Sequence, residues 1–239
     1  MATSAQPHVF EIAGKRVILS KIADALWRIQ VEVSGEVEEN RVWASALDQA
    51  TLDVRPEYLD LPLLLVFSEP LVLPPGQALT LYVQIPLRYE LRARWPNGKE
   101  DILLTLTPRH LQLAWVGPPN TGELAYYFVT HLINTLENEP QTSDRIYTPL
   151  RISNHASEPR TLERTILDSY QLSIYEMDGR LVTEVVNIRF DGEEAELFYT
   201  DEPPAWDAKE IRKGRVSAKE HGLARITKRS LTSLLFPKG

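Results

Sequence analysis

The chain has 239 residues, of which 43% are hydrophobic and 25% are charged, and its formal net charge is −7. This composition is that of a globular protein with a sizeable core, and the length suits one large all-β domain or two small ones. Cysteine is absent, which excludes disulfides, thiolate catalysis and Cys-based zinc sites.

The first eight residues are polar and lack the positive and apolar regions of a secretory signal. The longest apolar stretch, residues 61–67, is broken by Pro62 and is far shorter than the roughly 20 apolar residues of a membrane helix. We therefore expect a cytoplasmic protein with no membrane span.

Alternation of apolar and polar residues predicts strands in the first half of the chain. The expected strands of this half cover residues 26–33, 79–85, 89–95, 101–106 and 111–116. Asn97 and Gly98 lie between two of them and predict a hairpin, because both residue types tolerate positive φ.

The second half continues the same rhythm. Its expected strands cover residues 147–153, 160–167, 172–177, 180–188 and 196–199. We expect the first two to pair around the turn at residues 154–157. The pairs Asp178-Gly179 and Asp191-Gly192 predict further turns.

Short strands joined by regular turns are typical of a sandwich or barrel. We therefore predict an all-β fold of antiparallel β-sandwich architecture, which consists of two packed sandwich-like halves. The N-terminal half covers residues 1–118, the C-terminal half residues 119–205, and a basic tail residues 206–239.

Two segments have competing interpretations. In residues 122–136 the leucines fall at helical spacing, but the run 126–130 is rich in strand-forming aromatic and β-branched residues, so we predict a strand. In the tail, the apolar residues of 226–235 could form one face of a short helix, or the tail is an arm that packs on the body or stays mobile.

Three stretches resemble a known family. Residues 61–76 are a proline-punctuated strand, residues 113–127 contain a Gly-Pro turn, and residues 149–155 end in an Asn at a strand end. Together they resemble an uncharacterised domain-of-unknown-function family that is best represented in archaea. The likeness covers roughly residues 10–200 and leaves the basic tail outside. It implies one integrated β-rich unit, supports the strand within residues 122–136, and supplies no activity.

No motif in the sequence predicts a catalytic or cofactor site. The glycine motif of dinucleotide binding, the Walker loop, the Gly-x-Ser-x-Gly elbow and His-Glu-x-x-His are all missing. No two of the five histidines have metal-ligand spacing, although His131 and His155 could meet across a turn region. We therefore expect no metal and no cofactor.

Carboxylates cluster at residues 36–39, 193–196 and 201–202. We expect these runs to be solvated charges at turns. The alternatives are a pair of carboxylates that acts on a sugar, or a calcium site.

Four residues are candidate contacts for a protein partner. Trp95 precedes a hairpin turn, which makes it the tryptophan most expected to be exposed. Tyr126 and Tyr127 must point to opposite faces of a strand, so one of them is accessible. With His131 they lie on the segment that we expect to form a sheet edge.

The tail has nine Lys or Arg against three Asp or Glu, a net charge of +6 on a chain of −7. The candidate anion contacts are Arg212, Lys213, Arg215, Arg225, Lys228 and Arg229. Such clusters attract phosphates, although base-stacking aromatics are not interleaved with them. The alternative is an arm held against its own acidic body.

We interpret the chain as a non-enzymatic β-sandwich binding or assembly module that acts through protein–protein contacts or self-association, because open sheet edges invite strand addition. Two alternatives stay open. One is a carbohydrate-binding protein or hydrolytic enzyme with a cleft between the two halves. The other is a protein that binds nucleic acid or an anionic surface through the basic tail.

Overall fold

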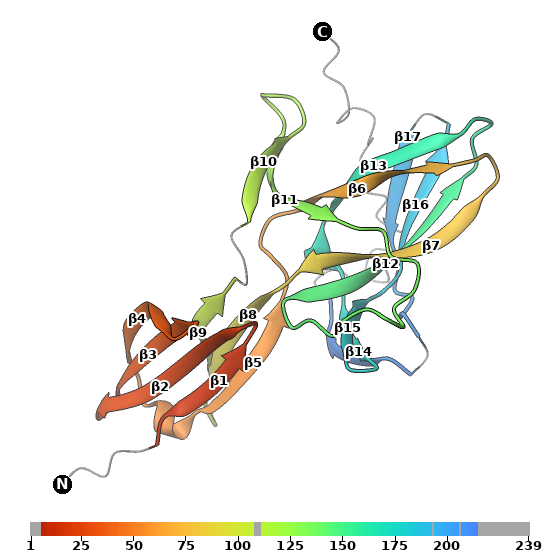
Figure 1. Ribbon diagram of the computed structural model, residues 1–239. Helices are drawn as coiled ribbons and strands as arrows, with labels where there is room; N and C mark the ends of the chain where they lie inside the picture. The colour runs from red at the N-terminus through yellow and green to blue at the C-terminus, as the bar shows by residue number, and fades with distance from the viewer. Residues whose placement is uncertain (1–5, 108–110, 193, 206, 215–239) are drawn as a thin grey trace. The chain divides into compact units, whose positions relative to one another are not determined.

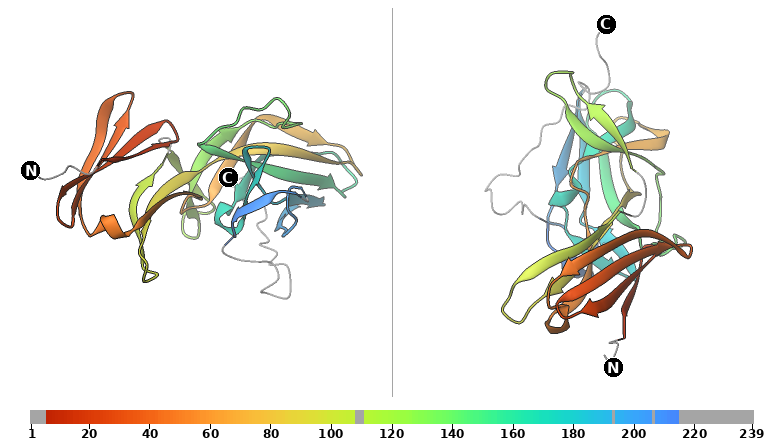
Figure 2. Two further views of the ribbon diagram at one scale, coloured as in Figure 1. Left: turned by 90° about the horizontal axis from the view of Figure 1, so that it is seen from below. Right: turned by 90° about the vertical axis from the view of Figure 1, so that its left-hand side faces the viewer.

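The computed structural model describes residues 6–107, 111–192, 194–205 and 207–214, which form two compact units. The first unit takes its described residues from 6–57 and 87–107, and the second takes them from 58–86 and from 111 onward. The chain thus leaves the first unit after Glu57 and returns to it at Leu87. The strands of each unit can be followed in Figures 1 and 2.

The predicted all-β fold is confirmed. The first unit contains β1 (His8–Ile12), β2 (Lys15–Ala23), β3 (Leu26–Val33), β4 (Glu36–Ala44), the 3-10 turn η1 (Leu47–Gln49), β5 (Thr51–Glu57), β8 (Arg88–Arg94) and β9 (Glu100–Leu106). The second contains β6 (Leu63–Leu73), β7 (Ala78–Pro86), β10 (Gln112–Val116), β11 (Glu123–Thr130), β12 (Arg145–Asn154), β13 (Arg160–Leu167), η2 (Ser169–Gln171), β14 (Ile174–Met177), β15 (Arg180–Thr183), β16 (Val186–Asp191), β17 (Glu194–Tyr199) and β18 (Lys209–Arg212).

The first unit consists of two antiparallel sheets with the strand orders β1-β2-β3-β4 and β5-β8-β9. Alternate residues of β2 and β3 are buried, among them Val17, Leu19, Ile29 and Val31. This is the period-two pattern of a sheet with one apolar side, which explains why the sequence predicted β3 with the bounds it has.

The second unit contains a sheet of order β10-β11-β6-β13 and a larger sheet of order β17-β16-β12-β15-β14-β18, in which β7 also pairs with β12. Most pairs are antiparallel, but β11 runs parallel to β6, and β12 runs parallel to both β15 and β16. Parallel neighbours cannot be joined by a tight turn, so these pairings bring together segments distant in sequence.

The expected pairing of residues 147–153 with residues 160–167 is wrong. Both segments are strands, but β12 pairs with β7 and β16, whereas β13 pairs with β6 in the other sheet. The connection between β12 and β13 is therefore an arch from one sheet to the other and not a hairpin. The connection between β6 and β7 makes the same crossing, since β6 and β7 also lie in different sheets.

Asn154 joins these two arches. Its buried side chain donates hydrogen bonds from Nδ2 to the carbonyl oxygens of Leu73 (2.8 Å) and Glu158 (2.9 Å), and its Oδ1 accepts one from the backbone N–H of Ala156 (2.9 Å). Its backbone carbonyl oxygen accepts a hydrogen bond from the N–H of Gly76 (2.8 Å), and its backbone N–H donates one to the carbonyl oxygen of Gln77 (2.9 Å). These bonds hold the chain where it changes sheets, which is the physical reason that no hairpin forms there.

The three other predicted turns are confirmed. Gly98 connects β8 to β9 with φ of 83°. Asp178 and Gly179 connect β14 to β15, both with positive φ, and Gly192 with φ of 88° lies between β16 and β17. Short polar residues and glycine occupy these positions because other side chains meet steric conflict at positive φ.

The strand predicted within residues 122–136 is confirmed as β11, and no helix forms there. In the basic tail, Lys209–Arg212 form the strand β18, which pairs with β14. The helix that we considered over residues 226–235 lies outside the described residues.

Candidate functional site

A cavity of about 770 Å³ opens in the second unit, next to the beginning of β12. Residues 129–135, from the end of β11 and the segment after it, form one wall, and Gln84 of β7 and Arg145 of β12 form another. Asn138 and Glu139 complete the lining. A volume of this size is typical of sites for small molecules.

Arg145 is held at this cavity by neutral groups. Its Nη1 donates to Oε1 of Gln84 (2.7 Å), and its guanidinium carbon lies 5.7 Å from the ring centre of Phe128. A carboxylate oxygen of Asp144 lies 3.9 Å from Nε. Within the described part of the chain, Nη2 has no hydrogen-bond partner. The cation is therefore positioned by Gln84 and Phe128, and its ion pair with Asp144 is at the long end of the range for a salt bridge.

The orientation of Gln84 is determined by a chain of hydrogen bonds. Its Nε2 donates to the hydroxyl oxygen of Tyr147 (2.9 Å), which in turn donates to the carbonyl oxygen of Pro140 (2.8 Å). Burial raises the pKa of the Tyr147 hydroxyl, so it stays a neutral donor at physiological pH. The amide oxygen of Gln84 must then face Arg145.

His131 belongs to the lining of this cavity, and its Nδ1 lies 2.7 Å from Oγ of Ser68. It does not meet His155, because His155 follows the far end of β12 and binds Phe190 through its backbone. The ten residues of β12 span about 30 Å. The sequence analysis did not single out Arg145, because a single arginine at the start of a strand belongs to no motif. The cavity is also built by three segments that are distant in sequence, so no local pattern marks it.

The β10–β11 hairpin places Tyr126 and Tyr127 on an inner strand. β10 covers one side of β11 and β6 covers the other, so the edge of this sheet is β10 and not the segment at residues 126–131. Figure 1 shows β10 on the outer side of β11. Tyr126 donates to Asp60 (3.0 Å). The role of both tyrosines and of His131 in binding a partner stays a prediction.

The outer strand β10 carries exposed apolar side chains. Leu113 and Trp115 lie opposite Tyr126 and Leu124 of β11, and Leu113, Trp115 and Leu124 are exposed. The indole N–H of Trp115 donates to the carbonyl oxygen of Pro118 (3.2 Å), and a Cβ at Gly122 would lie 2.5 Å from Nε1 of Trp115. The indole is thus held in place against a residue that must lack a side chain.

Trp95 is only partly exposed, and Trp115 is the more exposed tryptophan. The indole N–H of Trp95 donates to the carbonyl oxygen of Ala46 (3.3 Å), and Lys99 lies 5.1 Å from the ring centre. The hydrogen bond to Ala46, which immediately precedes η1, could not be predicted from the position of Trp95 in the sequence. Trp95 belongs to the first unit, and its role as a partner contact stays a prediction.

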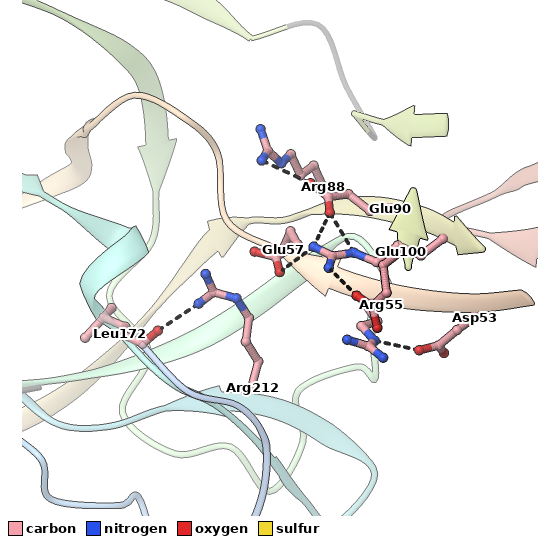
Figure 3. Close-up of polar contacts among 9 residues, drawn as sticks. Asp53, Arg55, Glu57, Arg88, Glu90, Glu100, Leu172 and Arg212 are labelled. Atoms are coloured by element: carbon pink, nitrogen blue, oxygen red, sulfur yellow. Dashed lines mark hydrogen bonds and ion pairs between the residues drawn. The ribbon is translucent and has the colours of Figure 1, made fainter. Parts of the chain in front are cut away.

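Opposite charges alternate along one side of the sheet β5-β8-β9. Across β5 and β8, Asp53 faces Arg92, Arg55 faces Glu90 and Glu57 faces Arg88. Arg92 binds the buried carboxylates of Glu90 (2.5 Å) and Glu57 (3.5 Å). Glu57, Arg88 and Glu90 of this network are labelled in Figure 3. Cross-strand pairs of this kind stabilise a sheet.

These buried carboxylates are engaged in ion pairs rather than arranged as a free acid–base pair. Burial lowers the pKa of Arg92, but its hydrogen bond to Glu90 and the charge of Glu90 outweigh burial, so that the pKa is raised. The cluster is therefore a structural network in the first unit.

Replacing Arg92 with methionine should lower the free energy of unfolding by about 2 kcal/mol, because Glu57 and Glu90 then lose their shared cation in a buried setting. This loss of stability is smaller than the loss expected on breaking a fully buried ion pair, because the Arg92 side chain is 23% exposed and Arg88 still binds Glu90. Urea unfolding measures the change. The control is Arg94→Met, an exposed cation of the same strand, and equal stability of the two variants would contradict the expected role.

Arg212, the first of the candidate anion contacts, makes its contacts within the second unit. Arg212 donates to the carbonyl oxygen of Leu172 (3.3 Å, Figure 3), and its guanidinium carbon lies 5.1 Å from the ring centre of Tyr58. Lys213 is exposed. The other candidate anion contacts, Arg215, Arg225, Lys228 and Arg229, lie outside the described residues.

We had expected all the acidic runs to lie at turns, but not all of them do. Residues 36–39 lie on β4, where Glu38 binds Lys15 (2.5 Å). Glu202 binds Arg151 through both carboxylate oxygens, at 3.0 Å each, and this hydrogen bond lowers the pKa of Glu202.

Among the residues that the structure describes, no three His, Asp or Glu side chains are grouped so as to hold a metal ion. Over the same residues, no helix is long and apolar enough to cross a membrane.

The structure therefore defines an all-β protein of two units, one of which has a ligand-sized cavity and an uncharged outer strand. Residues 3–233 match the model of a family described as a protein of unknown function, DUF432. The chain belongs to this family, and the match includes most of the basic tail, which the resemblance seen in the sequence had left outside. No curated protein and no solved structure matches the chain.

Proposed function

We propose that this protein is a non-enzymatic β-sandwich assembly module that self-associates by antiparallel pairing of β10 with β10 of a second copy. One observation carries the proposal. β10 is the outer strand of its sheet, has no charged residue, and exposes 56% of Leu113 and 53% of Trp115.

The composition of β10 contrasts with that of other outer strands. Natural sheets carry charged residues, proline or bulges at their edges, and these features prevent pairing with another strand. β4 carries Glu36, Glu38, Glu39 and Arg41, and β13 carries Arg160, Glu163 and Arg164. β10 has the sequence Gln-Leu-Ala-Trp-Val and none of these devices. An unprotected edge with apolar side chains is the expected signature of an edge that pairs.

A second copy fits this strand without a clash of charges. If the two-fold axis passes through Ala114, Leu113 of each copy lies opposite Trp115 of the other, on one side of the joined sheet. The row then continues into Leu124 and Tyr126 of each copy, which already flank Trp115 and Leu113. Such a closed two-fold contact is the commonest symmetry of soluble oligomers.

Replacing Leu113 with glutamate should weaken self-association at least roughly tenfold, because it places two buried charges beside Trp115 of the opposite copy. Light scattering during size-exclusion chromatography, over a series of concentrations, measures the mass of the wild type and of the variant. We expect the wild type to be dimeric and Leu113→Glu to be monomeric with an unchanged circular dichroism spectrum.

The matched control is Val72→Glu, because Val72 is 58% exposed but lies on β6, where it pairs with Thr161 of β13 and not with β10. This variant should dimerise as the wild type does. A wild type that stays monomeric at all concentrations, or a Leu113→Glu variant that dimerises normally, would contradict the proposal.

A further inference from the structure

We infer that the cavity of the second unit is a binding site for a small organic carboxylate, with Arg145 as the residue that binds the carboxylate group. This inference is independent of self-association through β10. It rests on the way Arg145 is held and on the kinds of side chain that surround it.

Arg145 is ready to bind before any ligand arrives. Its position is set by Gln84 (2.7 Å) and by the ring of Phe128 (5.7 Å), and Gln84 is itself held by Tyr147 (2.9 Å). Ordering a free arginine side chain costs conformational entropy on binding. Here that ordering is already accomplished in the folded protein, so more of the interaction energy remains for the ligand.

The guanidinium also keeps donors for a ligand. Nη1 uses one hydrogen for Gln84, and Nη2 has no partner among the described residues. Two parallel N–H groups of a guanidinium match the two oxygens of a carboxylate. A lysine at this place would offer only a point charge, so the residue type itself favours a planar anion.

The remaining lining favours a single negative charge. Asn134, Thr135, Asn138 and His131 provide polar groups, and Nδ1 of His131 lies 2.7 Å from Oγ of Ser68. Glu139 adds one carboxylate to the wall. Asp144 places a second carboxylate beside Arg145, at 3.9 Å from Nε. With one guanidinium and these two carboxylates, the cavity is poorly suited to a doubly charged phosphate, whereas a monoanionic carboxylate with further polar groups fits it.

The test is isothermal titration calorimetry of the full chain with acetate, lactate, succinate and glutamate, and with inorganic phosphate. We expect at least one carboxylate to bind more tightly than phosphate. Arg145→Met should weaken that binding at least roughly tenfold, because the lost contact is a charge-assisted pair of hydrogen bonds. The methionine retains the apolar contact with Phe128.

The matched control is Arg151→Met, which removes an arginine of the same strand that is exposed and bound to Glu202. It should bind the carboxylate as the wild type does. If Arg145→Met does not fold, Arg145→Lys serves in its place, and it should also bind more weakly because it lacks the planar pair of donors. The inference is overturned if no carboxylate binds, if phosphate binds as tightly, or if the folded Arg145 variant binds like the wild type.

Discussion

Replacing Asn154 with alanine should lower the free energy of unfolding by about 3 kcal/mol. The side chain is 1% exposed and makes three hydrogen bonds to the backbone of Leu73, Ala156 and Glu158. Each net hydrogen bond contributes about 1 kcal/mol, and buried groups left without a partner cost more. The loss falls on the point where both arches cross between the sheets of the second unit.

Urea unfolding gives the size of this effect, and hydrogen exchange followed by mass spectrometry gives its place. Protection should fall in the connections between β6 and β7 and between β12 and β13. Asn154→Asp should also be destabilising, because it retains the acceptor for Ala156 but loses both donors. The control, Asn120→Ala, removes an exposed asparagine and should leave stability unchanged. A stable Asn154→Ala variant would show that the arches are held by other contacts.

Replacing Glu184 with glutamine should stabilise the protein at pH 8 by about 3 kcal/mol. Burial raises the pKa of the Glu184 carboxyl to about 7 from an ordinary 4.5, and the charge of Asp201 acts in the same direction. One pKa unit corresponds to about 1.4 kcal/mol. Glutamine keeps an oxygen that can accept the hydrogen bond from the backbone N–H of Ser173, which is 2.5 Å from Glu184.

The pH dependence of stability has a definite sign. Below pH 4.5 the carboxyl is protonated in both the folded and the unfolded chain, so it costs nothing. Between pH 4.5 and 7 the unfolded chain releases the proton while the folded protein retains it, and each rise in pH therefore favours unfolding. Above pH 7 the full cost of the buried charge is present. The wild type should lose stability through this window, and Glu184→Gln should lose less.

Denaturant unfolding at a series of pH values between 4 and 8 measures this difference. The control is Glu202→Gln, since Glu202 is exposed and its pKa is lowered by Arg151. Its small contribution has the opposite sign, because an ion pair is lost as pH falls. If wild type and Glu184→Gln show the same pH dependence, Glu184 does not carry the buried proton that we expect.

Much of the local structure was predictable because it depends on neighbours in sequence. The bounds of β3 and the strand β11 followed from alternation and from strand-forming residues, and Gly98, Gly179 and Gly192 marked real turns. The pairing of the strands was not predictable in the same way. The turn after β12 looked like a hairpin, yet Asn154 uses it to bind Leu73, 81 residues away.

The candidate sites were predictable only in part. His131 was singled out as a partner contact, which stays a prediction, and the structure places it in the lining of the cavity. Arg145 and Gln84 were not singled out, since neither lies in a motif. The facing charges of β5 and β8 required the register of the two strands. Leu113 and Trp115 read as ordinary strand residues, and their exposure became evident only when β10 was found at an edge.

By itself the sequence determined that this protein is built from strands, where most of its turns lie, and that disulfides and thiolate chemistry are absent, because there is no cysteine. These properties follow from side-chain period, positive φ and residue type, all of which act within a few residues. The tertiary structure alone decided that residues 58–86 join the second unit, that three strand pairs run parallel, and that Arg145 faces a cavity. The physical reason is that long-range pairing is selected by the total burial of apolar surface and by backbone hydrogen bonds between distant segments, which no local pattern encodes.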